Sequence, residues 1–407
     1  MKILLINKFL YPQGGDSIMA LETGKLLSKK GHEVVFWGMN HPKNQYFPYQ
    51  DYFISNIDYN KHLKIFQKLK YSLKIIYSFE AKSKINIILK KLKPDIVHLN
   101  NFAHQISPSI LDVFKKYQIP VVMTIHDYKL VCPAYIMLLN NKICERCKNG
   151  RYYYCFLNKC TKGSMPKSFV NTIEMYLHHK ILKIYNNIDV FISPSKFLIN
   201  KLKEMGFNGD IVYLPNFVNS EEFIPQYQFY EKAVCYIGRL SSEKGLQTLI
   251  KAMVGLNIQL KIIGDGPIKN ILEARVKDLK LQNIRFLGFK SGNELKEEIA
   301  RSMAVVLPSE WYENNPRSVL EAFALGKPVI GAKIGGIPEL IKNYKTGLTF
   351  IPGNANDLSK KITFLSNNPK MIKVMGRNAR KYVEDNYNSL IYYQKLIKIY
   401  KEAIKNK

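Results

Sequence analysis

Short apolar runs separated by helical stretches dominate the first half of the chain. Residues 3–6 form one such run, a glycine turn follows, a helix is predicted over about 17–30, and residues 33–37 form the next strand. Further apolar strands are predicted at 95–99, 121–125 and 189–193. Continuous apolar strands that alternate with helices are typical of a parallel sheet covered on both faces.

The same alternation restarts after Pro215. Apolar strands are predicted at 233–237, 259–263, 284–287, 304–307 and 328–330. Pro194, Pro215 and Pro225 interrupt the periodicity between the two series. We therefore predict an α/β protein with two doubly wound Rossmann-like domains. The first covers residues 1–205, with a cysteine-rich insert at 132–163, and the second covers 206–387. A basic C-terminal helix at 388–407 is expected to pack back on the first domain.

Chain length supports the same division, because 407 residues are too many for one hydrophobic core. The sequence contains no run of about 18 apolar residues, so no transmembrane helix is predicted. The N-terminal strand is not followed by a cleavage site, and we therefore expect no signal peptide and a cytoplasmic location.

The formal net charge of +29 adds a constraint on partners. Such an excess of cations favours nucleic acid, an anionic membrane or an anionic substrate. Charge alone does not choose among these three.

Candidate chemistry lies in the loops that follow strands, because open α/β sheets bind ligands outside the carboxyl ends of their strands. After the strand that ends at residue 307, a polar loop carries Glu313, and a helix is predicted to begin near Pro316 and to carry Glu321. The N–H groups at that helix end suit a diphosphate, and the carboxylates suit sugar and ribose hydroxyls. The alternative is one solvated loop glutamate and one on a helix face.

This segment, with Gly326-Lys327-Pro328 and Gly335-Gly336 after it, resembles the family 4 retaining glycosyltransferases of the GT-B type and their Glu-x7-Glu signature. The resemblance is dense over residues 305–350. It implies two Rossmann-like domains facing a cleft, with Glu313 at the reaction centre. It also implies donor-binding roles for Asn315, Pro316, Ser318, Val319 and Glu321.

Other segments extend the resemblance. Gly238-Arg239-Leu240 and Glu243-Lys244-Gly245 are similar to the family's phosphate-binding segment, and Arg239 and Lys244 would neutralise the leaving diphosphate. Taken alone, both could be solvent-facing charges. Gly264 and Phe289 match loops that hold the nucleotide, with Phe289 beside the base.

In the first half, Gly14 and Gly15 follow the first strand and could bring backbone N–H groups close to a phosphate, although an ordinary tight turn is the alternative. His126 stands at the carboxyl end of another strand, and the resemblance implies that it lies near the donor sugar. A structural histidine is the competing interpretation. His98, Asn101 and His104 are weaker candidates for the acceptor site.

The resemblance implies a retaining, hexosyltransferase-type enzyme whose catalysis needs neither a metal nor another cofactor. Its expected partners are a nucleotide-sugar donor and a glycan or lipid-linked acceptor in bacterial polysaccharide or lipopolysaccharide synthesis. The alternatives are a sugar-nucleotide epimerase on the same double fold and a zinc-bearing basic nucleic-acid binder. No nucleic-acid motif is present, so we expect no nucleic-acid partner.

Five of the six cysteines fall in one window. Cys144-x2-Cys147-x7-Cys155-x4-Cys160 offers four thiols that suit a structural Zn²⁺, while reduced thiols and an iron–sulfur cluster stay open as alternatives. Cys132 is expected to be a separate buried thiol, and Cys235 a core strand residue.

Residues 61–93 contain ten lysines and one acidic residue, Glu80. Apolar residues recur at near-helical spacing among them: Leu63, Phe66, Leu69, Leu73, Ile76 and Phe79. The apolar stripe is expected to pack on the first sheet with the lysines in water. The alternative is a basic amphipathic helix on the inner face of an anionic membrane.

Overall fold

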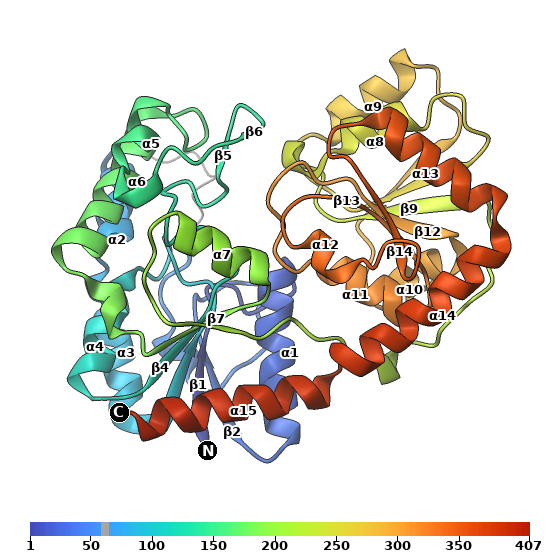
Figure 1. Cartoon of the computed structure of the whole chain (residues 1–407). Helices are drawn as coiled ribbons and strands as arrows, with labels where there is room; N and C mark the ends of the chain where they lie inside the picture. The colour runs from blue at the N-terminus through green and yellow to red at the C-terminus, as the bar shows by residue number, and fades with distance from the viewer. Residues whose placement is uncertain (58–64) are drawn as a thin grey trace. The chain divides into compact units, whose positions relative to one another are not determined.

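The computed structural model describes residues 1–57 and 65–407, and these form two compact units (Figure 1). The first unit comprises Met1–Leu139, Cys144–Leu214 and Tyr393–Lys407. The second comprises Asn140–Ile143 and Pro215–Tyr392. Within the described residues, no helix is both long enough and apolar enough to cross a membrane.

The first unit is built on a six-stranded parallel sheet with the order β2-β1-β3-β4-β7-β8. Its strands are β1 (Lys2–Ile6), β2 (Glu33–Trp37), β3 (Ile96–Leu99), β4 (Val121–Thr124), β7 (Val190–Ser193) and β8 (Ile211–Tyr213). The main helices are α1 (Gly15–Lys29), α3 (Phe79–Leu92), α4 (Leu111–Lys116) and α7 (Lys196–Glu204). Since β2 and β3 flank β1, the winding direction reverses between β1 and β3.

The second unit repeats this plan with the strand order β11-β10-β9-β12-β13-β14. Its strands are β9 (Ala233–Ile237), β10 (Gln259–Ile263), β11 (Ile284–Gly288), β12 (Ala304–Leu307), β13 (Val329–Ala332) and β14 (Gly347–Phe350). Its main helices are α8 (Leu246–Ala252), α9 (Lys269–Asp278), α10 (Gly292–Arg301), α11 (Arg317–Ala324), α13 (Ala355–Asn367) and α14 (Pro369–Asn386). The reversal here lies between β9 and β12.

Alternate residues of the second sheet's strands enter two separate apolar clusters. Val234 and Tyr236 of β9 belong to one cluster, and Cys235 between them belongs to the other. Successive side chains of a strand point to opposite faces, so both faces of the sheet are covered. Both sheets are therefore doubly wound, as the sequence predicted, and Cys235 is a core strand residue, also as predicted.

The boundary expected between residues 205 and 206 differs from the observed one. Strand β8 pairs in parallel with β7, and its backbone hydrogen bonds make it part of the first sheet. The second unit therefore begins at Pro215.

The insert contains two two-residue strands that pair with each other, β5 (Leu138–Leu139) and β6 (Lys142–Ile143). It also contains α5 (Tyr153–Leu157), and α6 (Met165–Tyr176) follows it. The insert therefore forms small local elements that add no strand to the main sheet.

The basic stretch forms two helices, α2 (Ile65–Ile76) and α3. Lys61 and Leu63 lie outside the described residues, as do the side chains of Phe66 and Leu69. Leu73 is 59% exposed and Phe79 78% exposed, so the expectation that these two pack on the sheet is wrong. Helix α3 instead buries a different face, which includes Ala81, Ile85, Ile88, Leu89 and Leu92.

The C-terminal helix α15 (Ser389–Lys405) contributes its last part to the first unit. The Tyr400 hydroxyl lies 2.6 Å from His98 Nδ1, and His98 Nε2 lies 2.8 Å from Thr124 Oγ1. His98 is fully buried on β3, and burial lowers its pKa to about 3, so the ring is neutral at neutral pH. Both ring nitrogens are used internally, and the prediction that His98 contacts an acceptor is wrong.

We expect Tyr400→Phe to lower the free energy of unfolding by about 1–3 kcal/mol, because it leaves a buried ring nitrogen without its partner. Tyr393→Phe is the matched control: the Tyr393 hydroxyl lies 3.0 Å from His32 Nε2 at a half-buried position of the same helix. Urea denaturation of both variants tests this. An equal loss of stability in the two variants would show that burial does not strengthen the Tyr400–His98 contact.

Candidate active site

The polar loops of the second unit gather where β9 and β12 lie side by side. The loop after β9 carries Gly238 and Arg239, and the loop after β12 carries Ser309 and Glu313. Carboxyl ends of parallel strands at a topological switch point are the usual ligand-binding edge of an open α/β sheet. The loops chosen from sequence thus meet at one edge of one sheet.

Glu313 is the centre of this group. It is only 7% exposed, and its Oε1 accepts hydrogen bonds from Lys244 Nζ at 2.6 Å and from Ser309 Oγ at 2.7 Å. Burial alone would raise the pKa of Glu313, but the Lys244 charge and the hydrogen bonds lower it below the ordinary value. The carboxylate is therefore held ionised at neutral pH. Lys244 also lies 4.9 Å from the Trp311 ring centroid.

Two glycines hold the backbone of this group in place. Gly245 has φ +68°, and a Cβ there would lie 1.9 Å from the Pro308 carbonyl oxygen. Gly335 has φ +59°, and a Cβ there would lie 2.4 Å from the Glu313 carbonyl oxygen, which accepts a hydrogen bond from Gly336 N at 2.6 Å. Sequence reasoning assigned no role to Gly335 and Gly336 beyond their place in the motif.

The loops after β9 and β10 lie against each other. A Cβ on Gly264 would be 1.9 Å from the Gly238 carbonyl oxygen, and Leu240 N donates to Asp265 O at 2.9 Å. The absence of a side chain at Gly264 is thus needed for loop packing. Arg239 is exposed, and Phe289, directly after β11, is 70% exposed. Both side chains are accessible to a ligand.

Helix α11 begins at Arg317, with Pro316 as its N-cap, so the predicted start near Pro316 is confirmed. The preceding Asn315 is buried, and within the described chain its Oδ1 has no hydrogen-bond partner. A buried acceptor of this kind suits a ligand donor group. Ser318 is half-buried, whereas Val319 is fully buried, so only the backbone of Val319 could contact a ligand.

Glu321 already has a partner. Arg317 Nε donates to Glu321 Oε1 at 2.7 Å across one turn of α11. Sequence reasoning missed Arg317, although the i,i+4 spacing of opposite charges on a helix was a usable signal.

In the first unit, several polar side chains lie beside the switch point between β1 and β3. Asn101 Nδ2 donates to Asp16 Oδ2 at 2.8 Å, and Asn101 N donates to Asn7 Oδ1 at 2.9 Å. His126 Nε2 lies 3.0 Å from Asn100 Oδ1. Burial lowers the pKa of His126, against the smaller opposing effect of Asp16, so His126 is neutral at neutral pH. A neutral ring suits a hydrogen-bonding role better than a charged one.

The glycine turn differs partly from expectation. Gly14 N donates to Ser17 Oγ at 3.1 Å and is therefore used inside the turn. Gly15 is the first residue of α1, and an ideal Cβ on it would meet nothing within 4 Å. Of the two glycines, Gly15 lies in open space at the start of a 15-residue helix.

His104 is half-buried with φ +70° and lies edge-on to Tyr135 at 5.8 Å between centroids. Burial lowers its pKa to about 3. His104 is therefore not the solvent-facing side chain that an acceptor site would need. Asn101, in contrast, lies at the edge of the sheet, where it contacts Asp16 and Asn7.

A buried ionic network behind His126 was missed. Lys129 Nζ donates to Glu174 Oε2, and Glu174 Oε1 lies 2.9 Å from His178 Nδ1. All three side chains are buried, and Lys129 N donates to Asp127 Oδ1 at 2.9 Å. The network ties the loop after β4 to α6. Its partners are 45 residues apart in the chain, so no local pattern identifies them.

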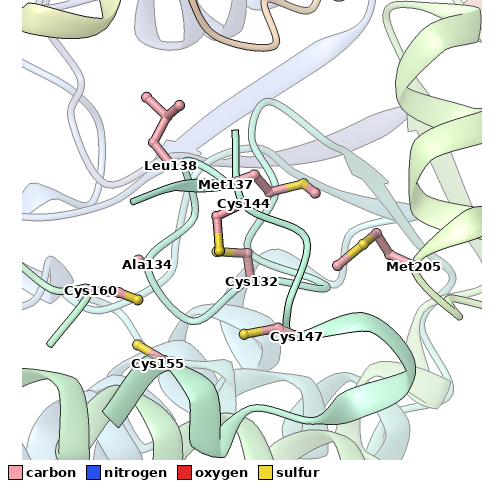
Figure 2. Close-up of a pocket in the computed structure, with 9 residues that line it drawn as sticks. All are labelled: Cys132, Ala134, Met137, Leu138, Cys144, Cys147, Cys155, Cys160 and Met205. Carbon is pink, nitrogen blue, oxygen red and sulfur yellow. The ribbon is translucent and has the colours of Figure 1, made fainter. Parts of the chain in front are cut away.

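The cysteines of the insert lie around one cavity. Cys144, Cys147, Cys155 and Cys160 line one small cavity (Figure 2). Cys132 is a buried thiol, as predicted, and it lines the same cavity. As placed, no three His, Cys, Asp or Glu side chains of the described residues form a ready metal site. All six cysteines of the chain are free thiols.

We expect Gly245→Ala to lower the free energy of unfolding by about 1–3 kcal/mol more than Gly255→Ala. Both glycines have a positive φ, but a Cβ at Gly255 meets nothing within 4 Å, whereas one at Gly245 meets the Pro308 carbonyl. In the control variant, only backbone strain lowers the free energy of unfolding, by about 1–2 kcal/mol. Chemical denaturation measures both, and equal losses would contradict the close approach.

Comparison with known proteins adds independent information. Residues 13–222 match the sequence profile described as Glycosyltransferase Family 4, and residues 219–382 match that described as Glycosyl transferases group 1. An uncharacterized 42.6 kDa protein in the cps region of Klebsiella pneumoniae is 29% identical over 361 residues, which span 84% of this chain and 87% of that protein.

Two solved structures are similar over their whole length. Sucrose-phosphate synthase from Thermosynechococcus elongatus superposes with a TM-score of 0.73 at 19% identity, covering 100% of both chains. Anabaena HepE in complex with UDP superposes with a TM-score of 0.69 at 16% identity, covering 99% of this chain and 100% of its own. Identities this low establish a shared fold only. With two doubly wound parallel sheets and a family match that alone spans residues 13–222, the chain belongs to glycosyltransferase family 4 and is a glycosyltransferase of the GT-B fold.

Proposed function

We propose that this glycosyltransferase binds a nucleotide diphosphate-sugar on its second unit and transfers the sugar to a glycan or lipid-linked acceptor. The observation that carries the proposal is the ion pair between half-buried Lys244 and buried Glu313 at the switch point of the second sheet. A cation and an ionised carboxylate held 2.6 Å apart offer opposite charges to the two polar parts of such a donor, its diphosphate and its sugar hydroxyls.

The donor's charge explains the composition of this edge. Arg239 is exposed beside Gly238, and Lys244 is fixed by Glu313, so two cations can meet a diphosphate. Backbone N–H groups at the start of α11 add the positive end of a helix dipole. The unpartnered Asn315 Oδ1 and the exposed ring of Phe289 would bind the nucleoside part. HepE, which shares the fold, was solved with UDP, and this supports a nucleotide ligand.

In the proposed reaction, the acceptor hydroxyl attacks the anomeric carbon on the face that the diphosphate leaves, so the configuration is retained. The bond from the anomeric carbon to the diphosphate oxygen breaks, and that oxygen takes the acceptor's proton. Lys244 and Arg239 stabilise the charge that develops on the leaving diphosphate. Glu313 stays ionised and accepts a hydrogen bond from a donor-sugar hydroxyl, which orients the ring. No group of the protein needs to act as the base, and this catalysis needs no metal.

The relative encoded in the cps region of Klebsiella pneumoniae supports a role in bacterial surface polysaccharide or lipopolysaccharide synthesis. The epimerase alternative is not favoured, because the family profiles are those of glycosyltransferases.

We expect Glu313→Ala to abolish sugar transfer while the chain stays folded. Glu297→Ala is the matched control, because Glu297 is an exposed carboxylate on α10. Donor turnover is measured across a panel of UDP-, GDP- and ADP-sugars with a membrane glycolipid extract as acceptor, and circular dichroism reports folding. Full transfer by Glu313→Ala would reject the assignment. Turnover of donor without any acceptor would favour an epimerase or hydrolase.

We further propose that the enzyme works at the inner face of the cytoplasmic membrane, where a lipid-linked acceptor lies. Helix α6 buries polar residues and exposes apolar ones, which is the opposite of an ordinary surface helix. Its buried residues are mostly polar: Ser168, Asn171, Thr172 and Glu174, together with Met175. Its exposed positions Met165, Phe169 and Ile173 are apolar and recur every four residues, and exposed Leu157 ends the neighbouring α5. We call Leu157, Met165, Phe169 and Ile173 the α6 surface.

Exposed lysines lie close to the α6 surface along the sequence. Exposed lysines occur at Lys159, Lys162, Lys167, Lys180 and Lys183. The only acid of α6, Glu174, is buried with Lys129. An apolar face within a field of lysines is complementary to an anionic bilayer, where each cation contributes about 1 kcal/mol near the surface.

We expect the double variant Met165→Glu/Phe169→Glu to bind phosphatidylglycerol-containing vesicles at least several-fold more weakly than the unmodified chain. Ile351→Glu/Val374→Glu is the control, because it places the same charges at exposed apolar positions of the second unit. Vesicle co-sedimentation measures binding. Equal losses in both variants, or equal binding of the unmodified chain to neutral phosphatidylcholine vesicles, would exclude this docking surface.

A further inference from the structure

Five cysteines from separate parts of the insert converge on one cavity. Cys132 precedes the β5–β6 hairpin, Cys144 and Cys147 follow it, Cys155 lies on α5 and Cys160 follows α5. Figure 2 shows their side chains directed around a shared space that Met137 and Met205 help to close. The cavity volume is about 10 Å³, which is enough for one small ion or one water.

Backbone hydrogen bonds hold these cysteines close to one another. Cys144 N donates to Met137 O at 2.8 Å, and Cys160 N donates to Cys155 O at 3.1 Å. The first bond closes the β5–β6 hairpin, and the second closes the turn after α5.

The surrounding backbone needs an additional source of stability. Many non-glycine residues with a positive φ fall within this short region: Tyr135, Met137, Asn140, Asn141, Asn149, Lys159 and Lys162. Each such residue costs about 1 kcal/mol, less for asparagine. The regular elements of the insert that could offset this strain are short: two two-residue strands, a three-residue 3-10 helix and a five-residue helix.

We propose that the insert is stabilised by one structural Zn²⁺ bound by four of these five thiolates, with Cys144 and Cys147 as the chelating pair. As placed, the thiols surround the cavity without forming a ready site. Binding therefore requires side-chain rotations that bring the sulfurs to about 2.3 Å from the ion. Each ligating thiol releases its proton to solvent on binding, and no electron transfer is involved.

Charge and volume favour this ion over other occupants. Four thiolates around Zn²⁺ leave two negative charges, and cations are abundant in the insert: Lys142, Arg146, Lys148, Arg151, Lys159 and Lys162. An iron–sulfur cluster holds several metal and sulfide atoms, so its entry requires a larger rearrangement of the insert than one ion does. A disulfide would use two of the five thiols and leave three unbonded thiols around the same cavity.

The test is metal analysis of the full-length chain, purified under a reductant from zinc-sufficient medium. We expect about one zinc per chain. Cys144→Ser and Cys147→Ser should each reduce the zinc content to background. Cys235→Ala is the control, because Cys235 is a buried thiol of β9 far from the cluster in sequence, and it should retain all the zinc. Chelator treatment should lower the melting temperature of the unmodified chain.

If the serine variants do not fold, Co²⁺ exchanged into the unmodified chain provides a second measurement, because thiolate ligands give charge-transfer absorption that oxygen ligands do not. A chain with only trace zinc and six titratable thiols overturns the proposal. So does a disulfide between any two of the five cysteines, or iron in place of zinc. Sugar transfer need not be measured, so these outcomes are independent of the proposed function.

Discussion

The contact between Lys244 and Glu313 constrains how closely the loops of the second unit must pack. A buried carboxylate is unfavourable unless it is paired and hydrogen-bonded, and Glu313 meets both conditions through Lys244 and Ser309. Each partner comes from a different loop, so those loops must approach closely. Gly245 and Gly335 permit that approach, because any side chain at either position would collide with backbone.

The two sheets place their polar loops at corresponding positions but gather different side chains there. Each places its polar loops where the winding direction reverses, between β1 and β3 in one unit and between β9 and β12 in the other. The second unit gathers the Lys244–Glu313 ion pair there, whereas the first gathers amides and a neutral histidine, Asn100, Asn101 and His126, near the carboxylate of Asp16.

Much of this arrangement could be predicted from local sequence, because long apolar runs mark buried strands and glycine-rich loops mark their ends. The edge strands β8 and β14 were not predicted, because β8 has only three residues, all half-buried, and β14 begins with a glycine. His98 and His126 both occur at the ends of strands, and only the distant Tyr400 separates a structural ring from a candidate site ring. The Lys129–Glu174 pair and the convergence of Cys132 with the other cysteines depend on tertiary contacts in the same way.

Helix α15 has a consequence for how the chain is made. The first unit contains both Met1 and Lys407, and Tyr400 closes over a histidine of its central sheet. A ribosome synthesises the first unit's strands early, but the residues that complete its core emerge last, after the whole second unit. Domains that emerge first usually fold first. Here the second unit can be complete while the first unit still lacks the helix that carries Tyr400.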